Sequence, residues 1–101
     1  MKNTNGRIKT SQPGLSQEAR KWHDDLKKAY SIHDEAGLIL LRQAAESFDR
    51  MRAAQRLISE NGITYKDRYG QPKLNPACTV ERDTRSQMLL CLKQLNLDLD
   101  V

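Results

Sequence analysis

The side chains in this sequence that could do chemistry are mainly basic, and they gather in three stretches of the chain. Three precede residue 10, four lie between residues 20 and 28, and three lie between residues 66 and 73. Lysine and arginine bind phosphate oxygens, so clusters of them predict contacts with a polyanion such as DNA. Solvated surface charge is the alternative for each cluster. The candidate phosphate-binding residues are Lys2, Arg7, Lys9, Arg20, Lys21, Lys27, Lys28, Lys66, Arg68 and Lys73.

The basic charge is concentrated near the N-terminus. The net charge is +4, and residues 1–30 carry seven Lys or Arg against three Asp or Glu, whereas residues 31–60 carry four against five. This asymmetry suits an N-terminal arm that meets a polyanion. It also suits a tail that only keeps the chain soluble, and the sequence leaves both interpretations open.

No constellation for catalysis, metal binding or cofactor binding is present in the sequence. His23 and His33 lie ten positions apart, without a His-Glu-x-x-His or Cys-x-x-Cys spacing. The five glycines are scattered, so neither a phosphate-binding loop nor a dinucleotide fingerprint can form. Adjacent acids such as Asp24 and Asp25 diverge by about 100° on a helix. We therefore expect no catalytic residue, no metal, no cofactor and no enzymatic activity.

The size and composition predict one small domain. The chain has 101 residues, of which 38% are apolar and 5% are aromatic, too few for two independent cores. No apolar run approaches the roughly 18 to 20 residues of a membrane span, and no signal peptide is recognisable, which predicts a cytosolic protein without membrane partners. Cys78 and Cys91 would lie about 20 Å apart on one helix, too far for a disulfide.

The N-terminal half predicts an arm and two helices. Residues 1–14 lack apolar periodicity and are typical of a flexible basic arm. Ser16 can cap a first helix over residues 17–30, in which Trp22 is expected to anchor the helix to the core. The predicted apolar stripe of this helix holds Ala19, Trp22, Leu26, Ala29 and Tyr30.

Asp34 is a good cap for a long second helix that reaches about Glu60, with Gly62 as a left-handed stop. Gln55 interrupts its main apolar stripe, which holds Leu41, Ala44, Phe48, Met51 and Ile58. A second apolar face is predicted to pack against another subunit and consists of Ile39, Ala53, Ala54 and Leu57. For Arg42, Arg50, Arg52 and Arg56, ion pairs with Glu46, Asp49 and Glu60, within the helix or between subunits, are favoured over contacts with DNA, which are the alternative.

The C-terminal part predicts a small β-hairpin or extended loop over residues 63–74, with a positive φ at Gly70, followed by a helix. Asn75 before Pro76 is a strong start signal for this third helix, over residues 76–95. Residues 98–101 form a short acidic tail. The predicted inner face of the third helix holds Val80, Thr84, Met88, Cys91, Leu92 and Leu95, and Leu97 closes the fold.

The expected fold is therefore mainly α, a three-helix protomer with a long central helix and a small hairpin before the last helix. Its core would be thin, because the ordered part holds one tryptophan and one phenylalanine. Self-association would add the missing apolar burial.

The order of these signals is itself distinctive. It comprises Leu15-Ser16-x-Glu18-Ala19-x-x-Trp22, Asp34, Asn61-Gly62, Tyr65-x-Asp67-x-Tyr69-Gly70, Asn75-Pro76-Ala77 and Leu92-x-x-Leu95-Asn96-Leu97. Over residues 15–97 this set resembles the compact small-terminase family of tailed bacteriophages. Gly70, Asn75 and Pro76 match the loop-to-helix junction of the family and carry over as structural residues, whereas Asn96 stands where a glycine is common.

The resemblance implies a non-enzymatic DNA-packaging subunit that assembles into a ring in the host bacterial cytoplasm. Such a subunit binds double-stranded viral DNA and recruits and regulates the large terminase subunit, which carries the ATPase and nuclease. The chain ends soon after Leu97, so the usual C-terminal contact region for the large subunit is expected to be short or absent. The alternative is a helical DNA-binding transcriptional regulator or protein-interaction module, as a monomer or a dimer on a palindromic site.

Overall fold

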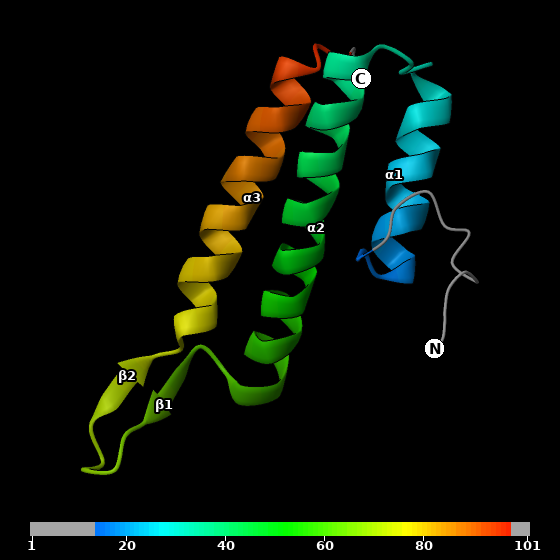
Figure 1. The fold of residues 1–101 in the computed structure, drawn as a ribbon. Helices are drawn as coiled ribbons and strands as arrows, with labels where there is room; N and C mark the ends of the chain where they lie inside the picture. The colour runs from blue at the N-terminus through cyan, green and yellow to red at the C-terminus, as the bar shows by residue number, and fades with distance from the viewer. Residues whose placement is uncertain (1–13, 98–101) are drawn as a thin grey trace, which may run out of the picture.

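The computed structural model describes residues 14–97, which form three helices and one small antiparallel sheet. The helices are α1 (Gln17–Ala29), α2 (Glu35–Asn61) and α3 (Pro76–Gln94), and the strands are β1 (Thr64–Lys66) and β2 (Pro72–Leu74). Figure 1 shows α2 in the middle, with the shorter α3 packed against it on one side and α1 beside the first part of α2 on the other. The predicted fold, mainly helical with a small hairpin before the last helix, is confirmed.

Each helix starts where a side chain can satisfy the free amides of its first turn. The side chains of Ser16, Asp34 and Asn75 accept a backbone N–H at 3.1, 2.9 and 3.0 Å, and Pro76 occupies the first position of α3. A cap of this kind contributes about 1 kcal/mol to helix stability. Each helix start is therefore determined by the residue that directly precedes the helix.

The helices end at residues that tolerate a left-handed backbone. Gly62, which follows α2, has φ +86° and donates its N–H to the Ile58 carbonyl at 2.7 Å. Asn96, two residues after α3, has φ +57°, and Ser31 in the turn between α1 and α2 has φ +52°. Asparagine accepts this conformation more readily than most side chains, which explains its place after α3.

The core joins α1 to one side of α2 and α3 to the other. Leu15 and Ala19 are buried against Ala45 of α2, and the Trp22 and Phe48 rings stack with centroids 4.7 Å apart and planes 4° from parallel. Trp22 therefore anchors α1, as its place on the apolar stripe predicts. On the other side the buried residues are mostly small, which lets two helices approach closely. They are Ala44, Ser47, Met51 and Ala54 of α2 with Ala77 and Cys91 of α3.

Three expectations about which residues of α1 and α3 are buried are wrong. Val80 was expected on the inner face of α3 but is 45% exposed, because the stripe that faces α2 starts at Ala77 and continues one turn later at Glu81. Ala29 and Tyr30 of the predicted α1 stripe are exposed as well. In their place His23, one turn after Ala19, is buried.

The molecule is flat and elongated. Its principal extents are 53 × 46 × 20 Å and its radius of gyration is 17.0 Å, against about 13 Å for a compact domain of 100 residues. A single layer of three helices covers each helix on only one or two sides. Among residues 14–97, no helix is long and apolar enough to cross a membrane.

Candidate nucleic-acid interface

The described basic candidates lie in two separate places. Figure 1 shows α1 beside the first part of α2, whereas the hairpin of β1 and β2 projects from the opposite end of the α2–α3 pair. Lys27 and Lys28, in the last turn of α1, are therefore remote from the hairpin. The third predicted group, Lys2, Arg7 and Lys9, lies outside the described residues, as does the acidic tail over 98–101.

Two of the α1 cations are engaged within the protomer. Arg20 donates from Nη1 to the Leu15 carbonyl at 3.0 Å and so ties down the chain that leads into the helix. Lys21 pairs with Asp25 at 2.8 Å on the exposed face, and the hydrogen bond to this carboxylate raises the pKa of Lys21. Lys27 and Lys28 have no ion-pair partner among residues 14–97, so they are the α1 cations best placed to meet a phosphate.

The hairpin has a tightly bonded turn. The Asp67 carboxylate accepts the backbone N–H groups of Tyr69 and Gln71, both at 2.9 Å, and Gly70 donates to the Asp67 carbonyl with φ +77°. The Asp67 N–H in turn donates to the Gln71 carbonyl at 2.9 Å. Asp67, the one acidic residue between residues 61 and 80, thus stabilises the turn, while the neighbouring cations project from the hairpin.

Asn75 fastens the hairpin to the helices. Besides capping α3, it donates its backbone N–H to the Ile63 carbonyl at 2.6 Å and its side-chain amide to the Gly62 carbonyl at 2.8 Å. The side chain is buried, at 9% exposure. One residue therefore joins the end of α2, the base of the hairpin and the start of α3, which fixes the direction in which the hairpin points.

Both strands are exposed along their whole length. Tyr65 pairs with Lys73 and Lys66 pairs with Pro72, so Lys66 and Lys73 project from opposite faces of the ribbon. At the tip, the Arg68 guanidinium lies 5.5 Å from the centroid of the Tyr69 ring, a cation–π distance, and Tyr69 is 76% exposed. The sequence predicts the cations of the hairpin as binding residues but not Tyr65 and Tyr69, although each tyrosine is next to one of these cations along the chain.

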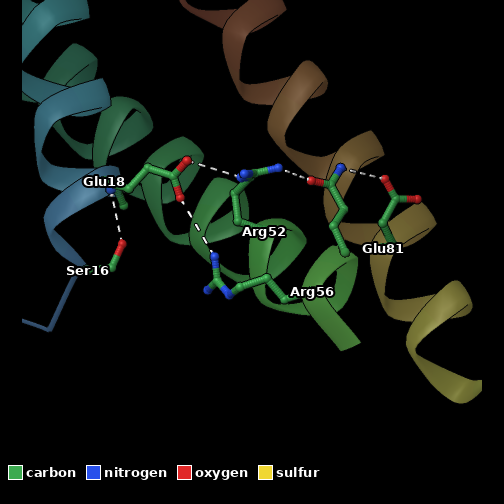
Figure 2. A network of polar contacts seen from close by, with 7 residues as sticks. Ser16, Glu18, Arg52, Arg56 and Glu81 are labelled. Atoms are coloured by element: carbon green, nitrogen blue, oxygen red, sulfur yellow. Dashed lines mark hydrogen bonds and ion pairs between the residues drawn. The ribbon is translucent and has the colours of Figure 1, made fainter. Parts of the chain in front are cut away.

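A polar network crosses all three helices (Figure 2). Glu18 of α1 pairs with Arg52 at 3.1 Å and with Arg56 at 3.9 Å. Arg52 also donates to the Gln55 side chain, and Gln55 donates to Glu81 of α3 at 3.1 Å. These residues hold α1, α2 and α3 together on one face of the layer.

Within this network, the pKa of Glu81 is shifted from its ordinary value. Gln55 donates a hydrogen bond to its carboxylate and Arg85 pairs with it, and both lower the pKa of Glu81. Of the ion pairs predicted for the arginines of α2, the one within the helix, Arg42 with Glu46 at 2.9 Å, is confirmed. Arg52 and Arg56 instead pair with α1 of the same protomer.

The predicted second apolar face of α2 is only partly exposed. Ile39 and Leu57 are 55% and 48% exposed, and Ala53 is exposed beside them. Ala54 is buried at 3%, because it lies on the side of α2 that faces α3. Ala53 and Leu57 belong to a shallow groove between α2 and α3, whereas Ile39 lines a separate hollow nearer the start of α2. The groove is lined by Arg50, Ala53, Ala54, Leu57, Ala77 and Val80.

Within residues 14–97 no three His, Cys, Asp or Glu side chains meet in a cluster that could hold a metal ion. His23 is buried beside Asp24, with 2.9 Å between Nδ1 and the carboxylate, and its Nε2 has no hydrogen-bond partner. Cys78 and Cys91 are both free thiols.

Comparisons with known proteins bear on which molecules the surfaces of this protein meet. Neither curated proteins nor solved structures yield a match. The family model described as phage terminase, small subunit, matches residues 28–100. The matched range starts at the last turn of α1 and contains all of α2, the hairpin and α3. Since it covers most of the chain, this protein belongs to the phage terminase small-subunit family.

Proposed function

We propose that this protein is a non-enzymatic adaptor for phage DNA packaging. It assembles with copies of itself into a ring, binds double-stranded viral DNA, and recruits and regulates the large terminase subunit in the cytoplasm of the host bacterium. The observation that carries this proposal is the match to the small-subunit family over residues 28–100.

The charge on the described surface supports the DNA-binding part of the proposal. Lys66, Arg68 and Lys73 project from a hairpin whose single carboxylate is bonded into the turn. Lys27 and Lys28 add a second exposed or half-exposed pair on α1. Because these groups are spread along the molecule, many copies in one assembly would present a repeated array of cations to the DNA backbone.

The flat shape supports self-association. The protomer leaves Ile39 and Leu57 of α2 and Val80 of α3 about half exposed, which is costly for a chain with so thin a core. A neighbouring copy that covers the groove would bury Leu57 and Val80, and one that extends along α2 would also bury Ile39. Ile39, Ala53 and Leu57 are the proposed interface residues, and the buried Ala54 supports the groove from beneath.

The DNA-binding part is tested by fluorescence anisotropy with labelled double-stranded DNA at several salt concentrations. We expect the affinity to fall steeply with salt, with a log–log slope of about −0.9 for each phosphate contact. An affinity that does not depend on salt would overturn phosphate binding. A simple dimer with a strong preference for palindromic half-sites one helical turn apart would indicate a transcriptional regulator instead.

A further inference from the structure

The β1–β2 hairpin combines features that point to one mode of DNA contact. It stands away from the helices, both of its faces are exposed, and it carries three cations (Figure 1). We infer that it enters the major groove of double-stranded DNA as a two-stranded ribbon, with the face that carries Lys66 toward the base edges. This inference rests on the proposed DNA-binding function and assigns it a specific element.

The dimensions of a two-stranded ribbon select the groove. Paired strands lie about 4.8 Å apart, and the van der Waals extent of the two backbones brings the width of the ribbon to roughly 10 Å. The major groove is about 12 Å wide and about 8.5 Å deep, whereas the minor groove is about 6 Å wide. Each strand here has three residues and is about 10 Å long at about 3.3 Å per residue. The major groove therefore admits the hairpin without distortion, whereas the minor groove would have to be widened, at a cost in DNA deformation energy.

The hairpin is organised before it meets DNA. Asp67 accepts two backbone amides in the turn, and Asn75 bonds to both Ile63 and Gly62 at the base. Because the two ends of the ribbon are fixed, little conformational entropy remains to be lost when it binds. A loop of the same composition would have to order itself first.

The surroundings of Tyr65 decide which face meets the bases. Tyr65 lines a hollow with Asn61, Asn75 and Pro76 where the hairpin joins the helices, so the Tyr65 side chain lies against the protein body. Lys73 is on the same face of the ribbon as Tyr65. Lys66 lies on the opposite face, since it neighbours Tyr65 in the strand.

The residues of the Lys66 face suit base edges. Lysine can donate to the O6 and N7 atoms of guanine, and Thr64 and Leu74 on the same face offer methyl groups that can contact the methyl group of thymine. At the tip, Arg68 and Tyr69 project beyond the strands, and the guanidinium is in position to bind a phosphate on the groove wall.

The test compares Lys66→Ala with Lys73→Ala in the full-length protein, two exposed substitutions that remove the same charge from opposite faces. Binding is measured by anisotropy on DNA duplexes of different sequence at about 150 mM salt. We expect Lys66→Ala to lose about tenfold in affinity for the preferred duplex and to lose discrimination between duplexes. We expect Lys73→Ala to lose less than about threefold, equally on all duplexes.

Chemical protection gives a second readout. Methylation of guanine N7 occurs in the major groove, so bound wild-type protein should protect N7 and Lys66→Ala should restore its reactivity. Equal losses for the two variants, or unprotected N7, would overturn the inference while leaving DNA binding intact. If the wild-type protein does not bind DNA at all, the proposed function itself fails.

Discussion

Glu18 in the first turn of α1 and Arg52 in the middle of α2 form an ion pair, with 3.1 Å between the carboxylate and Nε, although 34 positions separate them in the sequence. The network continues through Gln55 to Glu81, so this contact joins the small helix to the α2–α3 pair (Figure 2). The ion pair orients α1 against α2, because the apolar contact between these two helices is small.

We expect Glu18→Gln to lower the free energy of unfolding by about 0.5 kcal/mol, because both partners are about half exposed and solvent screens the pair. The measurement is urea denaturation at low and high salt, where high salt should reduce the difference from wild type. Lys21→Gln, which removes an exposed pair within α1, is the control and should change stability less. A larger loss for the control would contradict a special role of Glu18.

The pKa of Glu81 makes the network sensitive to acid. Because this pKa is lower in the folded state, the carboxylate stabilises the fold at pH values above its ordinary pKa of about 4.5. This contribution is lost as the pH falls through the folded-state pKa. Glu81→Gln should therefore reduce the dependence of unfolding free energy on pH in the window below about 4.5. Urea denaturation across that window measures the effect. Asp83→Asn, on the exposed side of α3, serves as the control, and an identical pH profile for wild type and Glu81→Gln would refute the assignment.

The stacked pair of Trp22 and Phe48 holds α1 to α2 by apolar contact. We expect Phe48→Ala to destabilise the protein by about 2 to 3 kcal/mol, somewhat less than for a fully buried ring. Trp22 is the only tryptophan, so its fluorescence should shift to the red in the folded variant as the ring gains water. Tyr69→Ala at the exposed hairpin tip should leave both stability and Trp22 emission unchanged. Unchanged emission in Phe48→Ala would contradict the stack.

Two substitutions of Asn75 distinguish its role as the cap of α3 from its role in holding the base of the hairpin. Asn75→Asp keeps an oxygen to accept the Ala77 N–H but loses the donor to the Gly62 carbonyl, whereas Asn75→Ala loses both bonds. We expect Asn75→Ala to cost about 2 kcal/mol and Asn75→Asp about half of that, measured by thermal unfolding. If the two variants were equally destabilised, the bond to Gly62 would carry the whole effect and the cap none.

The groove between α2 and α3 predicts where copies of the chain meet. Leu57→Glu places a charge in this groove and should lower the oligomeric state without unfolding the protomer, as measured by sedimentation velocity and circular dichroism. Leu90→Glu is the matched control, because Leu90 on α3 is exposed to the same extent as Leu57 but does not line the groove. Unfolding of Leu57→Glu, or an equal effect of Leu90→Glu, would count against this interface.

Most of the fold was predictable because its signals are local. The caps at Ser16, Asp34 and Asn75 set the starts of the helices, and the predicted ends lie within about one residue of the observed ones. Gly62 and Gly70 mark the stop of α2 and the turn of the hairpin for the same reason. None of these features depends on distant parts of the chain.

The remaining features depend on how the helices face one another. The burial of His23 and the exposure of Val80 depend on which side of each helix faces α2, which hydrophobic periodicity leaves open by about one position. The pairing of Arg52 with Glu18 joins residues far apart in the sequence, so the spacing within α2 cannot reveal it. Likewise, the cations of the hairpin could be selected from the sequence, but their distance from α1 could not.

The most direct test of the packaging role is native mass spectrometry of the full-length protein, alone and with double-stranded DNA and the large terminase subunit from the same phage. The account predicts a closed assembly of many identical subunits that binds DNA and gains the large subunit as a further component. A monomer or simple dimer under every one of these conditions would contradict it.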